Sequence, residues 1–125
     1  MKNGVNILVD SNILIYWLQG HQNAASILSE NYIHYPIITE IEVKGHMSFL
    51  TQLQKETFQK VLNKFKRAEL TEAVKELAIR YKVEYKLKTP DAIIAATARH
   101  LKIPLITADK KVAGIDNIVV VLFNP

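Results

Sequence analysis

The feature that most constrains the fold is an apolar run near the start of the chain, VNILVDSNILIYWL, over residues 5–18. Val5 to Val9 form a run of β-branched and apolar residues without alternation, which is typical of a strand covered on both faces. One carboxylate, Asp10, interrupts the run, and Ser11 or Asn12 behind it can cap a short helix over residues 13–18. A buried strand followed directly by a helix favours an α/β layer fold.

Further strands of the same sheet are predicted at intervals along the chain. One passes through Ile37 and Ile38, and two others are the apolar segments IPLIT and NIVVVLF near the C-terminus. Residues 67–70 are a further candidate. Strands that alternate with helices indicate parallel pairing. The sequence therefore predicts an α/β fold with a central, mainly parallel sheet of four to five strands flanked by helices.

The predicted helices carry recognisable start signals. Thr39 can cap a helix over EIEVKGHM, and Thr71 can cap an amphipathic helix. Thr89 can cap the Ala-rich segment TPDAIIAATARHL, in which Pro90 occupies the first turn, where its missing N–H costs nothing. Another amphipathic helix follows Thr51, and its predicted apolar face gathers Leu50, Leu53, Phe58, Val61, Leu62 and Phe65.

Length and composition limit the class of protein. A chain of 125 residues suits one domain over residues 1–125, and 49% apolar residues are ordinary for a globular protein. The absence of Cys excludes disulfides and thiolate metal sites and fits a reducing cytoplasm. The first apolar run is short and lacks a cleavage site, so we predict neither a signal peptide nor a membrane span. The net charge of +4 permits binding to a polyanion, but a solvated surface explains it equally well.

Four acidic residues differ from the others because each follows or interrupts an apolar segment. Asp10 and Asp109 follow predicted strands, whereas Glu42 and Asp91 lie near the starts of predicted helices. In an open parallel sheet these positions share one edge, and ligands bind there. Four carboxylates can share a small volume only if some take up protons or a cation neutralises them. Oxygen-only ligands favour a hard ion, Mg²⁺ or Mn²⁺.

Each acid also has a purely structural interpretation. Asp10 could be a helix cap, and Asp91 could simply favour the helix dipole. Acids at helix starts are common, which applies to Glu42 as well. Taken together, four acids at one predicted edge shift the balance towards a metal site.

Four blocks of sequence carry a family resemblance. They are ILVDSNILIYWL, PIITEIEVKG and the segment KTPDAIIAATARHLKIPLITADKK, which contains the third and fourth blocks. In this order they resemble the PIN-domain nucleases, and in particular the VapC-type toxins of bacterial and archaeal toxin–antitoxin pairs. The resemblance covers nearly the whole chain and implies a PIN-like three-layer fold.

The resemblance also implies site residues. The first Asp of the family's acidic quartet matches Asp10, the helix Asp matches Asp91, and the late Asp matches Asp109. Asn12 and Thr107 resemble secondary positions that orient carboxylates or waters.

The second block contains two candidates for the family's Glu, because TEIEVKG includes both Glu40 and Glu42. We assign Glu42, which lies three residues after Thr39 and three before Gly45, a spacing that resembles the family's. Glu40 would then point to another part of the helix surface.

The implied activity is hydrolysis of RNA phosphodiester bonds by a Mg²⁺- or Mn²⁺-dependent endoribonuclease of the cytoplasm. By resemblance, Asp10, Asp91 and Asp109 mainly coordinate the ion, and Glu42 holds a second ion or orients the attacking water. The family also implies a small antitoxin whose tail covers the acidic site, and often a homodimer.

Other interpretations remain open at this level. A non-catalytic PIN-like module would bind RNA or protein, although the presence of all four carboxylates argues against it. A phosphoryl-transfer receiver domain would need an acidic pair that the sequence lacks. Tyr16 and Trp17 are interpreted as core packing or a partner contact rather than as base-stacking residues. The lysines near the acids have two interpretations: they are solvated surface residues, or they guide an RNA backbone towards the site. They are Lys82, Lys86, Lys88, Lys110 and Lys111.

Overall fold

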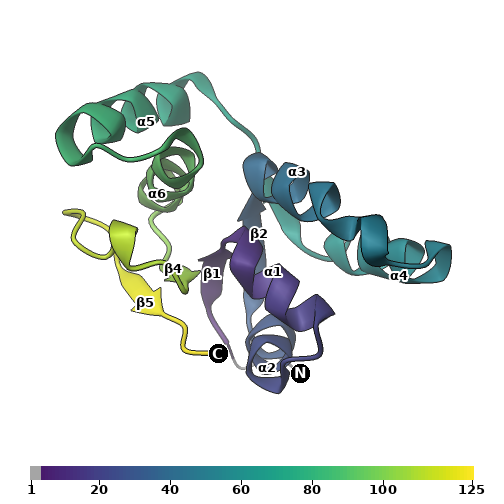
Figure 1. Cartoon of the computed structure of the whole chain (residues 1–125). Coiled ribbons are helices and arrows are strands. Elements are labelled where there is room, and N and C mark those ends of the chain that lie inside the picture. The colour runs from purple at the N-terminus through teal and green to yellow at the C-terminus, as the bar shows by residue number, and fades with distance from the viewer. Residues whose placement is uncertain (1–3) are drawn as a thin grey trace.

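A five-stranded sheet, parallel throughout, forms the centre of the molecule (Figure 1). The computed structural model describes residues 4–125. The strands, in the order β3-β2-β1-β4-β5 across the sheet, are β1 (Asn6–Val9), β2 (Tyr32–Pro36), β3 (Lys66–Ala68), β4 (Leu105–Thr107) and β5 (Val120–Leu122). The predicted sheet is confirmed, and the candidate at residues 67–70 corresponds to the edge strand β3.

Helices cover both faces of this sheet. They are α1 (Ser11–Leu18), α2 (Gln22–Glu30), α3 (Ile37–Gly45), α4 (Gln52–Leu62), α5 (Glu72–Tyr85) and α6 (Thr89–Leu101), with 3₁₀ turns η1 (Met47–Phe49) and η2 (Lys110–Val112). In Figure 1, α5 and α6 lie on one side of the sheet, and α1, α2 and α4 lie on the other. The α/β three-layer fold expected from the sequence is therefore confirmed.

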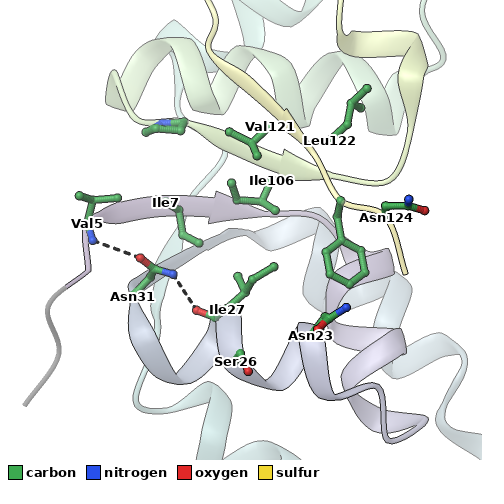
Figure 2. A pocket seen from close by; sticks show the side chains of 12 residues that line it. Val5, Ile7, Asn23, Ser26, Ile27, Asn31, Ile106, Val121, Leu122 and Asn124 are labelled. Carbon is green, nitrogen blue, oxygen red and sulfur yellow. Dashed lines mark hydrogen bonds between the residues drawn. The ribbon is translucent and has the colours of Figure 1, made fainter.

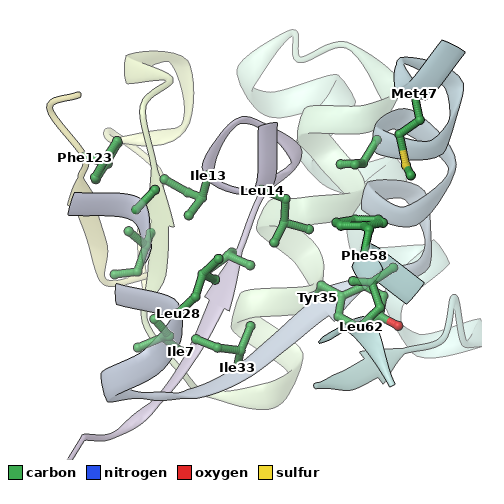
Figure 3. Packing of buried hydrophobic residues seen from close by; sticks show 14 residues of the cluster. Ile7, Ile13, Leu14, Leu28, Ile33, Tyr35, Met47, Phe58, Leu62 and Phe123 are labelled. Atoms are coloured by element: carbon green, nitrogen blue, oxygen red, sulfur yellow. The ribbon is translucent and has the colours of Figure 1, made fainter. Parts of the chain in front are cut away.

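The alternation of side chains along β1 explains the two layers. Ile7 and Val9 belong to the apolar cluster beneath α1, α2 and α4, whereas Leu8 belongs to the cluster beneath α5 and α6. In the first cluster Phe58 of α4 packs with Leu14 of α1 (Figure 3). Because β1 is covered on both faces, it has no polar face, as its sequence predicts.

The order of the strands reverses between β1 and β4. The chain passes from β1 to β2 and β3 on one side, then returns through α5 and α6 to place β4 on the other side of β1. In open parallel sheets the crevice at such a reversal is where ligands bind. The carboxyl ends of β1 and β4 are therefore the expected location of a functional site.

The second strand ends earlier than its apolar sequence predicts. It stops at Pro36, and Ile37, Ile38 and Thr39 form the start of α3, so the expected strand through Ile37 and Ile38 is wrong. Pro36 holds an extended backbone at the N-cap position, and its missing N–H cannot extend the ladder. Thr39 is consequently buried inside the helix and does not cap it.

Two other helix starts also differ from expectation. Asp10 is the N-cap of α1, in place of Ser11 or Asn12. The helix α6 begins at Thr89 itself, and Lys88 occupies its N-cap position without a side-chain hydrogen bond, so Thr89 does not cap it.

The remaining predictions for the helices have mixed outcomes. Thr71 caps α5 as expected, because its Oγ1 accepts a hydrogen bond of 3.2 Å from the Val74 amide. Pro90 lies in the first turn of α6, also as expected. Leu53, placed on the apolar face of α4 from the sequence, is 73% exposed. None of the helices within residues 4–125 is long and apolar enough to cross a membrane.

A pocket of about 550 Å³ opens on the face of the sheet beside α2 (Figure 2). Asn31 links two of its walls: its Oδ1 accepts from the Val5 amide at 3.2 Å, and its Nδ2 donates to the Ile27 carbonyl at 3.0 Å. The lining residues include no acidic side chain, so this pocket is separate from the candidate metal ligands.

Candidate active site

The carboxylate of Asp10 lies at the end of β1 and is almost fully buried, with 5% of the residue exposed. Its Oδ1 accepts a hydrogen bond of 3.3 Å from the Ile13 amide, which caps α1 and fixes the orientation of the side chain. Its Oδ2 accepts a hydrogen bond from the hydroxyl of Thr107, at the end of β4. Asp10 therefore joins the two strands between which the strand order reverses.

Burial raises the pKa of Asp10 from an ordinary 3.8 to about 6. Hydrogen bonds from Thr107, Ile13 and the Asn12 backbone lower this pKa, but they do not offset the loss of solvation, and the charge of Asp109 raises it slightly further. Desolvation and a nearby like charge both disfavour the ionised carboxylate. A positive charge at this position would oppose both effects.

Thr107 connects Asp10 to the second aspartate of the site. While its hydroxyl donates to Asp10, the same oxygen accepts a hydrogen bond of 3.0 Å from the Asp109 amide. The Asp109 carboxylate in turn accepts from the Lys111 amide at 2.9 Å and caps η2. One threonine thus holds the segments that carry two acids of the predicted quartet.

Asp91 lies in the first turn of α6, as predicted, and is partly buried. Burial raises its pKa, and the charge of Asp109 raises it further, whereas Lys111 and Lys88 act in the opposite direction. Asp91 and Asp109 are therefore close enough to repel each other. The structure brings Asp10, Asp91 and Asp109 into one electrostatic cluster in which Asp109 interacts with both of the others.

The cluster is looser than a completed metal site. Within residues 4–125, no three acidic or histidine side chains lie close enough together to hold one ion. Three carboxylates with few compensating charges repel one another, which favours separated positions. The structure thus assembles the three aspartates at one edge without closing them into a ligand shell.

Glu42 lies in the second turn of α3, farther into the helix than its predicted place near the start. Glu42 is not among the charges that shift the pKa of Asp10 or of Asp91 in the described part of the chain. Its Oε1 is buried and has no hydrogen-bond partner among the described residues. Such an atom is unusual, because buried polar atoms are nearly always paired.

Glu40, the competing residue of the same block, has its carboxylate occupied. It pairs with Lys44 at 2.6 Å and with Arg67 at 3.2 Å. The hydrogen bond from Lys44 is the largest of the effects that lower the pKa of Glu40. This ion-pair cluster ties α3 to β3, which gives Glu40 a structural role at the surface.

Asn12 lies beside the site through its backbone. Its side chain is exposed, while its amide donates a hydrogen bond to the Asp10 carboxylate. Of the lysines noted in the sequence, Lys88 and Lys111 lie near enough to Asp91 to stabilise its charge. Lys82 instead donates to the Thr89 hydroxyl at 2.9 Å.

Comparisons with known proteins agree with this geometry. A family model of the PIN domain matches residues 7–118, so the chain belongs to the PIN-domain family. The family resemblance drawn from four blocks of sequence is thereby confirmed, and a chain that is 33% identical to this one belongs to a toxin–antitoxin complex. No curated protein matches the chain.

Three solved structures illustrate the similarity. A chain of a toxin–antitoxin complex from Klebsiella pneumoniae is 33% identical, with a TM-score of 0.80 over 90% of this chain and 95% of that one. A chain of FitAcB from Neisseria gonorrhoeae is 20% identical, with a TM-score of 0.75 over 91% and 95%. A chain of VapBC2 from Rickettsia felis, bound to a promoter DNA fragment, is 18% identical, with a TM-score of 0.74 over 95% and 99%. The last two comparisons show the same fold.

Proposed function

We propose that this PIN domain is a divalent-metal-dependent endoribonuclease that acts as the toxin of a toxin–antitoxin pair. The single observation that carries the proposal is the cluster of Asp10, Asp91 and Asp109 at the reversal of strand order. Ligands of open parallel sheets bind at this point, and carboxylates suit a cation that also meets phosphate oxygens.

The donor set fits Mg²⁺ or Mn²⁺. The four candidate side chains are all carboxylates, and hard cations prefer oxygen ligands. The unpaired, buried Oε1 of Glu42 is an atom that a ligand or its water would satisfy. In this proposal Asp10, Asp91 and Asp109 hold the ion in part through waters that it retains, and Glu42 holds a second ion or orients the attacking water.

The residues of the chain then have distinct tasks. When bound, the cation would polarise the phosphodiester and neutralise charge that develops on its oxygens. Thr107 keeps Asp10 and Asp109 on adjacent segments through its two hydrogen bonds. Lys88 and Lys111 favour the ionised form of Asp91, which is the form that binds a cation.

The proposal includes macromolecular partners. The 33%-identical chain belongs to a toxin–antitoxin complex, which supports an antitoxin as a partner. By the family resemblance, the proposed antitoxin is small and its tail covers the acidic site. RNA is the proposed substrate, the cytoplasm is the proposed location, and a homodimer is the proposed active form.

The decisive experiment compares RNA cleavage by three proteins prepared identically. Wild type is expected to cleave single-stranded RNA in the presence of Mg²⁺ or Mn²⁺. Cleavage should stop when EDTA removes the cation. Asp10→Asn should lose about 100-fold or more of this activity, by analogy with the removal of one transition-state contact. Asp116→Asn removes the same charge from an exposed residue outside the cluster and should retain activity. Equal cleavage by wild type and Asp10→Asn would remove Asp10 from the mechanism.

Direct metal titration by calorimetry separates the enzyme from a non-catalytic PIN-like module. Binding of Mn²⁺ that is abolished by Asp10→Asn and kept by Asp116→Asn supports the enzyme. Absence of binding at millimolar Mg²⁺ and Mn²⁺ would favour the module.

A further inference from the structure

A second pocket lies beside the chain segment that carries Asp109. It has a volume of about 400 Å³ and is lined by Tyr16 of α1, by Ala108 and Lys110 on either side of Asp109, and by residues 122–125. This volume lies within the range of small-ligand sites, roughly 300–1,000 Å³. Two of its walls, Ala108 and Lys110, are the chain neighbours of Asp109, so the pocket borders the segment that carries this acid.

The aromatic wall of the pocket is held in place. The ring of Tyr16 packs edge-on against His21, with centroids 5.0 Å apart and an interplanar angle of 66°. It also packs against Phe123, with centroids 5.7 Å apart and an angle of 41°. The sequence interpretation of Tyr16 as core packing or a partner contact, rather than as a base-stacking residue, agrees with its place against the apolar cluster, but the residue also lines an open pocket. Fixed aromatic rings are the usual stacking surfaces for unpaired bases.

Two consecutive lysines follow Asp109 in the chain and have different surroundings. Lys110 lines the pocket, whereas Lys111 lies close enough to Asp91 to act on its charge. Successive residues of a 3₁₀ turn are about 120° apart, which accounts for the divergence. Neither lysine forms a salt bridge with another described side chain, so both remain available to an external anion.

We propose that this pocket is a nucleotide subsite, in which Tyr16 stacks on the base next to the scissile phosphate and Lys110 contacts the adjoining phosphate. The amide of Asn124 at the pocket wall can donate to and accept from a base edge. The RNA backbone would then cross Asp109 and continue towards Lys111 and Lys88. The subsite rests on the ribonuclease activity proposed above, and it selects single-stranded RNA, because a stacked and paired base cannot enter.

The test measures RNA binding in the cleavage-deficient Asp10→Asn background, by fluorescence anisotropy of a labelled single-stranded RNA. Adding Tyr16→Leu should weaken binding about tenfold, the scale of one lost base–aromatic stack. Tyr16→Phe keeps the ring and should bind as the parent does. Lys110→Ala should reduce the slope of log affinity against log salt by about 0.7. Lys60→Ala, which removes an exposed lysine of α4 that forms no salt bridge with a described residue, should leave the slope unchanged.

A series of RNAs, each lacking one base, separates stacking from a folding defect. The difference between the parent and Tyr16→Leu should disappear with the RNA that lacks the base next to the cleavage site, and persist with the others. A general folding defect would weaken binding to every RNA of the series. Far-UV circular dichroism and thermal melting of each variant provide the accompanying check on the fold.

The outcomes distinguish failure of the subsite from failure of the enzyme. If wild type cleaves RNA while Tyr16→Leu and Lys110→Ala bind it as tightly as the parent, the subsite is wrong and the ribonuclease stands. If these variants lose affinity only for a protein partner, the pocket is a protein-docking site and the subsite is again wrong. If wild type neither cleaves nor binds RNA, both proposals fail.

Discussion

At the scale of single residues, Asp10 has two conflicting requirements. Its side chain must be buried to cap α1 and join β1 to β4, yet burial disfavours its charge. The negative charge of Asp10 becomes favourable only when a cation binds beside it. The stability of the metal-free protein should therefore improve when this charge is removed.

We expect Asp10→Asn to stabilise the metal-free protein near neutral pH. Between about pH 3.8 and about pH 6 the folded protein retains a proton that the unfolded chain releases, so the free energy of unfolding falls as pH rises through this window. Two pKa units correspond to about 3 kcal/mol, and we expect a gain of about 1–3 kcal/mol at about pH 8. Urea denaturation in EDTA at about pH 8 and about pH 4 measures it. An equal gain at both values would contradict the assignment of the effect to ionisation.

The two glutamates of α3 provide a matched pair. Glu42→Gln should abolish cleavage while changing the free energy of unfolding by less than about 1 kcal/mol. Glu40→Gln should retain cleavage and lose up to about 1 kcal/mol, because it breaks partly exposed ion pairs with Lys44 and Arg67. Cleavage assays and denaturation curves on both variants measure these effects. Loss of cleavage in Glu40→Gln alone would move the catalytic assignment to Glu40.

At the scale of elements, the difference between Thr71 and Thr89 can be measured. Thr71 caps α5 and Thr89 does not cap α6, although both precede helical sequences. Thr71→Ala should lower the free energy of unfolding by about 1 kcal/mol. Thr89→Ala should change it by less than about 0.5 kcal/mol, since Thr89 is exposed and its hydroxyl accepts a hydrogen bond from the exposed Lys82. Chemical denaturation of both variants measures these changes. Equal losses in the free energy of unfolding would show that Thr89 caps α6 after all.

The same elements show what the sequence could predict. Buried strands were recognised because β-branched runs without alternation occur where both faces of a sheet are covered. The end of β2 was missed because Ile37 and Ile38 fit a strand and a helix equally well, and the deciding factor is the missing N–H of Pro36. Periodicity also placed Leu53 inside, although no element covers it enough to bury it.

The site was predictable to the extent that it depends on strand ends. Asp10 and Asp109 follow parallel strands, so their meeting follows from topology. The position of Glu42 relative to the aspartates depends on the length and direction of α3, which a pattern of residues does not determine. The pocket beside Asp109 was also beyond reach, because it forms only where the last residues of the chain pack against Tyr16.

At the scale of the whole molecule, a bound cation should raise the melting temperature. A ligand that binds only the folded state at 100 times its Kd adds about 2.7 kcal/mol, which corresponds to about 10 °C for a domain of this size. Differential scanning fluorimetry with increasing Mn²⁺ measures the shift. The melting temperature of Asp91→Asn should not rise with Mn²⁺, whereas that of Asp116→Asn should rise as in wild type. A shift of equal size in both variants would locate the ion elsewhere.

The central position of β1 also has a consequence for how the protein is made. Asp10 and the threonine that holds it are 97 positions apart, and they meet only when β4 has paired with β1. Contacts between such distant segments form late, because a long loop must close first. A nascent chain that already carries Asp10 therefore lacks the other half of its site until β4 has been synthesised and has paired with β1. For the proposed ribonuclease, synthesis of Asp10 and completion of its site are thus separated in time, and a chain that ends before β4 lacks Thr107 and Asp109 and is expected to be inactive.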